Sequence, residues 1–275
     1  EVSVVEMMPN LLPGADQDLV KFLTDRVKSQ FTEVMVNSKV VEMKDQKNGI
    51  KVTIEDKEGK QKNKIYDRVL VAIGRTPVTD DLGLENTGVQ IDDNGFIVTD
   101  NQQRTAENSI FAIGDIVGEP MLAHKASREG IVAAEVISGQ KSVFEPYAIP
   151  AVVFTDPEIA WAGLTETEAK NENIDVEIAK FQWSASGRAT TLGRNDGVTK
   201  LLIEPESERI LGVGIVGPGA GELIAEGVLA IEMAATAEDL HLSIHPHPTL
   251  SETIMEAAEV FYGHATHLYR PRRKK

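Results

Sequence analysis

The sequence predicts an α/β protein, with α+β architecture in its last part. Short runs rich in Val and Ile alternate with stretches of helical periodicity, which is typical of mixed folds. Hydrophobic residues make up 41% and charged residues 26% of the chain, as in folded globular domains. The 275 residues exceed what one core usually carries, so we expect two or three units.

The first unit is predicted to contain a strand, a helix and several further strands. Residues 1–6 (EVSVVE) form a β-branched run, and residues 16–30 follow the turn PNLLPGAD with helical periodicity. Ile50, Val52 and Ile54 alternate with other residues, as one buried face of a sheet requires. The other expected strands cover residues 33–36, 39–43, 49–56 and 66–73.

The second unit is predicted to begin with a hairpin and to end in a helix. In residues 88–100 (GVQIDDNGFIVTD) the pair Asn94 and Gly95 lies between alternating runs and indicates a two-residue turn, because both positions must tolerate positive φ. Residues 109–114 (SIFAIG) are a continuous apolar run and predict a buried strand. Residues 123–138 predict an amphipathic helix.

The third unit is predicted to interleave strands and helices. The strands are expected near residues 151–155, 176–183, 198–203 and 210–216, and the helices at 165–171, 222–235 and 251–261. Around residues 145–150 the composition shifts to Pro and aromatic residues, which indicates a boundary. The expected domains are therefore 1–76, 77–147 and 148–275.

Charge and cysteine content exclude several classes of function. The net charge of −15 repels phosphate backbones and anionic lipid, so it disfavours nucleic-acid and membrane partners and favours a small molecule or a protein. No apolar run approaches the ~20 residues that span a bilayer. The absence of Cys excludes disulfides, thiolate metal sites and a Cys nucleophile within these residues. The chain begins at Glu1 without an initiator Met, so we expect a fragment.

Glu6 is a candidate nucleotide ligand. An acid at the end of a β-strand is where a dinucleotide-binding βαβ unit places the carboxylate that accepts the ribose hydroxyls of NAD. A solvated strand-end acid is the alternative, and Glu6 alone does not decide between them. Gly212, Gly214 and Gly217 satisfy Gly-x-Gly-x-x-Gly, but they alternate within an apolar run and are interpreted as strand glycines against which another backbone packs.

The histidines of the last third raise the possibility of a metal site, which the prolines disfavour. His241 and His245 have the HxxxH spacing, but Pro246 and Pro248 predict an extended segment over residues 244–249. His245 and His247 would then share one side with no acidic or thiol third ligand nearby. We therefore assign no metal.

His247 and Glu252 are the candidate acid–base pair. Residues 249–252 (TLSE) form an N-cap signal that places Glu252 in the first turn of a helix. A His between two prolines, followed five residues later by this Glu, is arranged for His–Glu pairing, which would select the tautomer and stabilise the imidazolium. The alternative is a loop histidine beside a capping box, and the spacing alone leaves both open.

Three segments together carry a family resemblance. They are residues 69–77 (VLVAIGRTP), 110–130 (IFAIGDIVGEPMLAHKASREG) and 245–252 (HPHPTLSE). They resemble the flavin-dependent pyridine nucleotide–disulfide oxidoreductases, in order and over essentially the whole chain. The resemblance implies the second half of a Rossmann-like NAD domain, the carboxyl part of an FAD-contacting central domain and an α+β dimerisation domain.

The resemblance also implies roles for individual residues. Glu6 would bind the NAD ribose, and Gly74 and Arg75 would lie near the bound NAD. Asp115 would accept a hydrogen bond from the FAD ribityl chain. His247 would be the acid–base residue, with Glu252 as its partner. The flavin would be wrapped by residues at the start of a helix, which are Met121, Leu122, Ala123 and His124.

The implied whole enzyme oxidises protein-bound dihydrolipoamide with NAD through FAD and a redox disulfide. It would be a homodimer whose partner is the lipoyl-bearing acyltransferase of a 2-oxo acid dehydrogenase complex. It would lie in the bacterial cytoplasm or, in a eukaryote, in the mitochondrial matrix. The family's amino-terminal FAD half and its redox cysteines are absent here, so we expect the isolated chain to be inactive. The alternatives are a sibling of the glutathione or mercuric reductase type and a non-catalytic dimerisation fragment.

Overall fold

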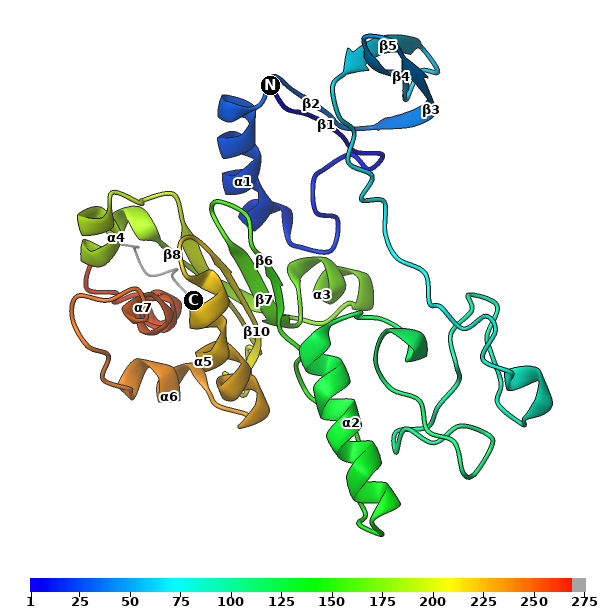
Figure 1. The fold of residues 1–275 in the computed structure, drawn as a ribbon. Coiled ribbons are helices and arrows are strands. Elements are labelled where there is room, and N and C mark those ends of the chain that lie inside the picture. The colour runs from blue at the N-terminus through cyan, green and yellow to red at the C-terminus, as the bar shows by residue number, and fades with distance from the viewer. Residues whose placement is uncertain (269–275) are drawn as a thin grey trace. The chain divides into compact units, whose positions relative to one another are not determined.

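The computed structural model describes residues 1–268 and confirms the mixed α/β class. The chain forms two compact units, one of residues Glu1–Leu70 together with the part from Tyr147 onward, and the other of Val71–Pro146 (Figure 1). The first and third predicted domains thus contribute to one unit of this chain. The division into domains 1–76, 77–147 and 148–275 stays a prediction for a longer protein.

The amino-terminal part of the first unit is a βαβ element followed by a meander. β1 (Ser3–Val5) and β2 (Glu33–Met35) pair in parallel, and α1 (Gln17–Gln30) connects them. β3 (Ser38–Gln46), β4 (Gly49–Asp56) and β5 (Gln61–Tyr66) form an antiparallel sheet. Val52 and Ile54 of β4 are buried, as predicted, whereas Ile50 is only partly buried and Thr53 is buried between them.

The rest of the first unit is built on a five-stranded antiparallel sheet in the order β6-β7-β10-β9-β8. Its strands are β6 (Ala151–Val153), β7 (Ile159–Gly163), β8 (Glu177–Gln182), β9 (Val198–Ile203) and β10 (Ile210–Val216). Its helices are α3 (Glu166–Glu172), α4 (Gly187–Leu192), α5 (Ala220–Glu232), α6 (Ala237–Leu242) and α7 (Glu252–Tyr262), with the 3-10 turn η3 (Trp183–Ala185). The sequence analysis missed β7, α4 and α6.

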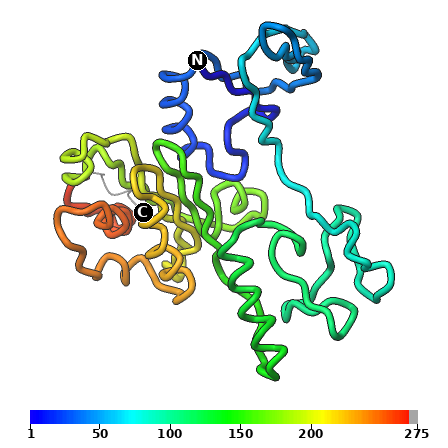
Figure 2. The backbone as a smooth tube through the Cα atoms, viewed as in Figure 1, coloured from blue at the N-terminus to red at the C-terminus, as the bar shows by residue number. Residues whose placement is uncertain are grey.

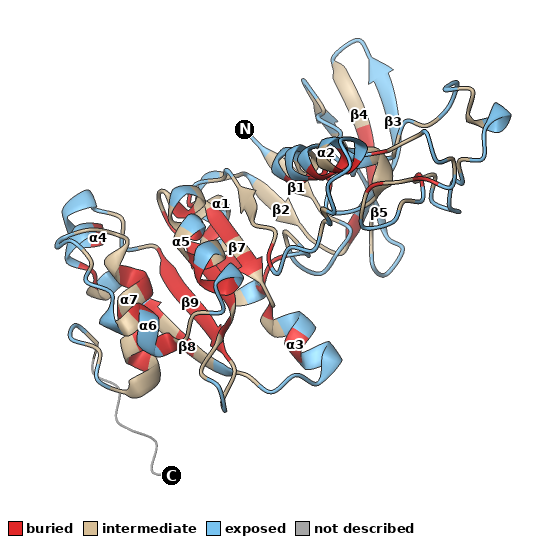
Figure 3. Ribbon diagram, turned by 90° about the horizontal axis from the view of Figure 1, so that it is seen from below, coloured by how far each residue is buried: buried red, intermediate tan, exposed pale blue. Residues whose placement is uncertain are grey.

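The two faces of this sheet are covered by different helices. Val213 and Ile215 of β10 belong to a core cluster with α5, α6 and α7, whereas Val216 packs with α1. Figure 3 shows the buried residues concentrated in the central strands and on the helix sides that face them. A Cβ on Gly214 would collide with Leu19 of α1, and a Cβ on Gly212 would collide with the backbone of Leu164. Gly212 and Gly214 are therefore strand glycines, as interpreted, although a side chain and not a backbone packs against Gly214. Gly217 lies just after β10, so its assignment to the strand is wrong.

The second unit has little regular structure, as its long loops in Figure 2 show. It contains the 3-10 turns η1 (Leu84–Asn86) and η2 (Gly114–Val117) and the helix α2 (Ala123–Ile137), which confirms the predicted helix. The strand predicted over residues 109–114 is wrong, because only an isolated bridge between Arg104 and Phe111 forms there.

Two further predictions need correction. Residues 67–73 form no strand, and Leu70 and Ile73 are 91% and 94% exposed, because no neighbouring strand pairs with this run. The hairpin at residues 88–100 is reduced to one bridge, between Ile91 and Ile97. Only Gly95 of the proposed turn pair has positive φ, since the carboxylate of Asp92 closes the loop by accepting from the backbone N–H of Asn94 and Phe96. In the described residues no helix is long and apolar enough to cross a membrane.

Candidate active-site residues

The loop between α6 and α7 holds the predicted His–Glu pair. Residues 244–249 are not helical, as Pro246 and Pro248 require. His247 Nδ1 lies 2.9 Å from Oε1 of Glu252, the first residue of α7. The other carboxylate oxygen, Oε2, accepts a hydrogen bond from the backbone N–H of Thr249 at 2.7 Å. Both oxygens of Glu252 are thus fixed, and the pairing that the spacing suggested is present.

The geometry leaves the outer nitrogen of His247 for chemistry. An ionised carboxylate can only accept, so Nδ1 is the nitrogen that donates to it, and in the neutral ring Nε2 keeps its lone pair. The His247 side chain is 65% exposed, whereas that of Glu252 is 15% exposed. A base that is accessible at Nε2, and oriented from behind by a partly buried carboxylate, is suited to proton transfer with a bound substrate.

The start of α7 is held differently from the predicted N-cap. The N-cap residue Ser251 makes no capping hydrogen bond with its side chain. Instead Thr249 Oγ1 donates to the carbonyl of Pro246 at 2.7 Å. Thr253 Oγ1 lies 2.7 Å from Thr199 Oγ1 of β9, in the buried core. The helix start is therefore tied to the sheet, and Glu252 is placed by the core below it.

The other histidines of this region are engaged separately. His245 Nε2 lies 2.7 Å from Glu226 Oε1 of α5, and its Nδ1 lies 2.9 Å from the carbonyl of Ser243. His241 Nδ1 lies 3.5 Å from Glu259. The helix α6 ends at Leu242, so His241 and His245 do not share a helix face.

A cluster of three acidic side chains lies on the face of the sheet that is opposite to α7. In the part of the chain that the structure describes, the carboxylates of Asp16, Asp18 and Glu166 approach one another within 4.8 Å. Lys200 Nζ lies 2.6, 2.8 and 2.9 Å from these three groups, and its side chain is fully buried. Lys180 Nζ also lies 2.7 Å from Asp18 and 2.9 Å from Glu166, so two ammonium groups hold the acids together, and the cluster is read as structural.

In the second unit, Arg75 connects the expected nucleotide-side and flavin-side residues. Its Nη2 donates to the carbonyl of Met121 at 2.7 Å, and its Nη1 lies 3.5 Å from Asp115. Gly74 has φ +117°, a conformation that favours glycine. The N-cap residue of α2 is Leu122, whose side chain cannot accept a hydrogen bond. The positive end of the helix therefore remains uncapped by a side chain, beside Met121 and Ala123.

Sequence analysis missed the pair that holds this corner together. Glu129 and Lys125 are buried, and their charged groups lie 2.8 Å apart. Glu129 Oε2 also accepts from the backbone N–H of Gly114 at 2.7 Å, and Lys125 Nζ donates to the carbonyl of Gly118. The pair thereby attaches the loop that carries Asp115 to the helix α2. The signal was a Lys and a Glu four residues apart on the helix.

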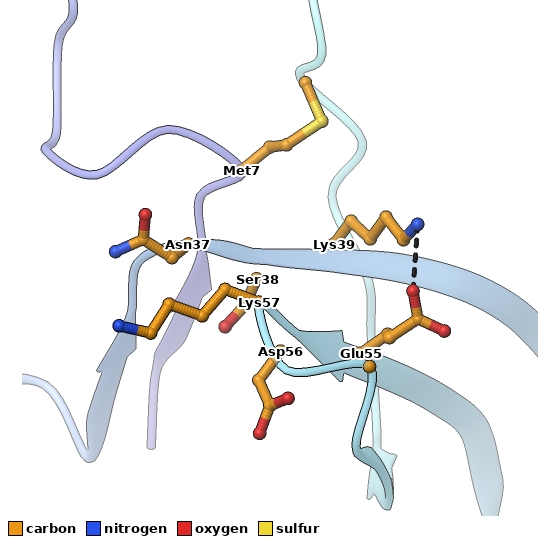
Figure 4. A pocket seen from close by; sticks show the side chains of 8 residues that line it. Met7, Asn37, Ser38, Lys39, Glu55, Asp56 and Lys57 are labelled. Atoms are coloured by element: carbon orange, nitrogen blue, oxygen red, sulfur yellow. Dashed lines mark ion pairs between the residues drawn. The ribbon is translucent and has the colours of Figure 1, made fainter.

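Glu6 lies at the end of β1, as predicted. Its Oε1 accepts from the backbone N–H of Met8 at 2.7 Å. The nearby hollow in Figure 4 is lined by Met7, Asn37, Ser38, Lys39, Glu55, Asp56, Lys57 and Gly59. The ion pair of Lys39 and Glu55 crosses one side of it, and Glu6 does not line it.

Comparison with known sequence families gives the class of protein. Residues 149–258 match the family described as pyridine nucleotide-disulphide oxidoreductase, dimerisation domain. Residues 1–130 match the family described as pyridine nucleotide-disulphide oxidoreductase. The chain belongs to the pyridine nucleotide-disulphide oxidoreductases.

Curated relatives narrow the similarity to one kind of enzyme. The chain is 50% identical over 275 residues to the dihydrolipoyl dehydrogenase of Vibrio cholerae, covering 100% of this chain and 58% of the relative. It is 49% identical over 268 residues to that of Haemophilus influenzae, with 98% and 56% covered. It is 45% identical over 269 residues to that of Thermus scotoductus, with 98% and 58% covered. The chain thus spans less than two thirds of these relatives.

Solved structures share the fold. LpdA from Mycobacterium tuberculosis matches with a TM-score of 0.86 at 26% identity, over 94% of this chain and 56% of that one. The HOCl-induced flavoprotein disulfide reductase RclA from Escherichia coli matches with a TM-score of 0.84 at 23% identity, over 94% and 59%. The latter similarity concerns the fold alone.

Proposed function

We propose that this chain is the carboxyl part of a dihydrolipoamide dehydrogenase. The whole enzyme would oxidise protein-bound dihydrolipoamide to lipoamide and reduce NAD, through FAD and a redox disulfide contributed by residues beyond this sequence. The observation that carries the proposal is the pair of His247 and Glu252, with Nδ1 bound to the carboxylate and Nε2 accessible. Identity of 50% to a dihydrolipoyl dehydrogenase supports the choice of substrate.

His247 would move the protons of the dithiol. Its Nε2 accepts the proton of a substrate sulfur, and the resulting thiolate attacks the redox disulfide, because the thiolate and not the thiol is the nucleophile. Glu252 is then the group that stabilises the imidazolium, since its Oε1 faces Nδ1. The proton returns to solvent from the exposed ring.

The residues proposed for FAD fit a polar, electron-rich group. FAD would supply the transfer of electrons between the disulfide and NAD. Asp115 presents a half-exposed carboxylate for a ribityl hydroxyl. The start of α2, at Met121, Leu122, Ala123 and His124, offers the positive end of a helix that no side chain caps.

The residues proposed for NAD fit a ribose and an approaching backbone. Glu6 has one carboxylate oxygen fixed by Met8, which orients the other as an acceptor. A negative charge there would oppose the additional phosphate of NADP. A Cβ on Gly74 would meet no atom within 4 Å, and with Arg75 this residue is proposed to lie near the nicotinamide nucleotide.

Residues 149–258 would form the homodimer interface. They match the family's dimerisation domain, and large apolar side chains are exposed there. The most exposed of these are Phe154, Leu229, Met233, Leu242 and Ile244. Burying such side chains against a second copy removes apolar surface from water. The lipoyl-bearing acyltransferase of a 2-oxo acid dehydrogenase complex would be the further partner, in the cytoplasm of a bacterium.

The substrate and nucleotide of the longer protein test this proposal. With purified holoenzyme, dihydrolipoamide and NAD should give turnover, whereas glutathione disulfide with NADPH should give little. Turnover of glutathione disulfide in place of lipoamide would overturn the substrate class. Glu6→Arg should narrow or invert the preference for NAD over NADP, and an unchanged ratio would make Glu6 an ordinary strand-end acid.

The 275-residue chain itself provides a second test. It contains no Cys, so it should show no lipoamide turnover, because no disulfide is present to exchange with the dithiol. It should nevertheless sediment as a dimer through the part that begins at residue 149. Measurable turnover would refute the need for the disulfide, and a monomer would refute the dimer.

A further inference from the structure

A second His–carboxylate pair lies directly beside the first. Glu256 of α7 is 2% exposed, and its Oε1 is bound to His267 Nδ1 in a short contact. Glu256 follows Glu252 by four residues, so the two carboxylates lie on one side of α7, one turn apart. Each one binds the Nδ1 of a histidine that comes from outside the helix.

The two imidazole rings are also neighbours. The ring centroids of His247 and His267 are 6.3 Å apart, and the ring planes differ by only 8°. Both rings bind their carboxylates through Nδ1, so Nε2 remains the outer nitrogen of each. In the chain up to residue 268, no hydrogen bond engages either Nε2. The site thus holds two parallel His–Glu pairs, of which only the first follows from the spacing in the sequence.

The carboxylate of the second pair is buried. Glu256 Oε2 is buried and has no hydrogen-bond partner among residues 1–268. A buried carboxylate remains ionised only when a cation compensates for the lost water. His267 is the cation within reach, and its 44% exposed side chain can take a proton from solvent. The buried Glu256 carboxylate therefore faces an ionisable ring that solvent can reach.

We propose that His267, charged through the buried Glu256, is a positioning residue that keeps the neighbouring His247 in its neutral, proton-accepting form. This inference rests on the proposed function of His247. Two like charges about 6 Å apart repel each other, so a proton on His267 disfavours a second proton on His247. His247 then remains a competent base at a lower pH than it would alone.

The other charged groups around this corner are engaged elsewhere. Glu226 of α5 binds His245, and Glu259 of α7 faces His241 of α6 and accepts from the backbone N–H of Thr266. His264 stacks against Tyr262 and contacts His241.

The lysines of β8 and β9 point to the opposite face of the sheet. Lys180 and Lys200 bind Asp18 and Glu166 there, whereas Thr199 faces α7. The lysines therefore do not act on His247, whereas the ring of His267 stacks against it.

The test is the pH dependence of dihydrolipoamide oxidation by the longer holoenzyme. His267→Gln should move the acid limb of the kcat/KM profile to higher pH, by roughly 0.5–1 unit, because it removes the positive charge beside His247 and leaves the negative charge of Glu256. His267→Lys restores a positive charge and should return the limb toward the wild-type position. His264→Gln is the matched control, because it changes a histidine of the same segment without touching His247, and it should leave the limb in place.

The outcomes separate this inference from the function on which it rests. If His247→Gln abolishes lipoamide turnover while His267→Gln lowers kcat without moving the acid limb, His267 has only a structural role and the inference is wrong. A shift in His267→Gln that His267→Lys fails to reverse also overturns it, because the effect is then not one of charge. If the wild-type enzyme does not oxidise dihydrolipoamide, the proposed function fails first.

Discussion

The five-stranded sheet and residues 67–122 contain similar apolar sequences with opposite outcomes. Ile159–Gly163 (IAWAG) is β7, and it is paired on both sides by β6 and β10. Residues 69–74 (VLVAIG) are at least as apolar, yet they form no strand, and Ile73 is almost fully exposed. The partner strands, more than the composition of the run, therefore decide whether a strand forms.

The two regions also differ in how they use a buried lysine. Lys200 of β9 forms ion pairs with three carboxylates, in a sheet that is covered by helices on both faces. Lys125 of α2 binds one carboxylate, Glu129, and the pair supports a loop. The first cluster holds together elements far apart in sequence, whereas the second acts locally.

The largest expected contrast is between Trp183→Ala and Ile73→Ala. Trp183 is fully buried, its indole N–H donates to Thr199, and its ring fills the space beside Gly217. Its removal should lower the free energy of unfolding by about 3–5 kcal/mol. Ile73→Ala in the 275-residue chain should change it by less than about 0.5 kcal/mol.

Urea denaturation followed by circular dichroism measures both variants. If Ile73→Ala were as destabilising as Trp183→Ala, residues 69–74 would have to be buried in solution, and the comparison would break down. Val71→Ala is a second control, because Val71 is also exposed.

A contrast of similar size is expected for the two lysines. Lys200→Met leaves three carboxylates without their central cation and should cost about 3–5 kcal/mol. The fluorescence of Trp161 and Trp183, the two Trp of the chain, should report this loss as a lower urea midpoint. Lys125→Met should leave that midpoint unchanged and accelerate hydrogen exchange in Gly114–Val117 and α2. A lowered Trp midpoint for Lys125→Met would show that the two regions unfold as one.

Acid should weaken the sheet region through Asp18. Burial alone would raise the pKa of this carboxyl, but its bonds to Lys180 and Lys200 outweigh burial and lower the pKa. Because the pKa is lower in the folded than in the unfolded state, the stabilisation is full above the unfolded value of about 3.8 and is lost as the pH falls through the folded value.

Asp18→Asn is the variant that checks this sign. Its free energy of unfolding should fall less steeply than that of the wild type below about pH 4. Asp25→Asn is the matched control, since Asp25 lies on the same helix in an exposed pair with Lys21. An unchanged slope in Asp18→Asn would contradict the role of the cluster.

The sequence predicted the local part of the fold and of the site. Helices α1, α2 and α7 have helical periodicity within their own residues, and the pairing of His247 with Glu252 spans only five positions. Runs 66–73 and 109–114 were mispredicted, because strand formation depends on neighbours that a run does not encode.

The second pair and the cluster around the buried Lys200 were missed for the same reason. His267 reaches Glu256 only after the chain turns at Gly263, and Lys200 meets Asp16 across 184 positions. No local spacing signals either contact.

The half-reactions of His247→Gln in the longer holoenzyme test the central claim most directly. His247 is proposed to handle thiol protons only, so dihydrolipoamide oxidation should fall by roughly 10²–10⁴-fold. Oxidation of NADH by an artificial dye, which bypasses the disulfide, should persist at nearly the wild-type rate. Glu252→Gln should give a smaller loss of the same kind. Equal loss of both activities in His247→Gln would contradict the acid–base assignment and would place the defect in folding, dimer formation or the flavin site.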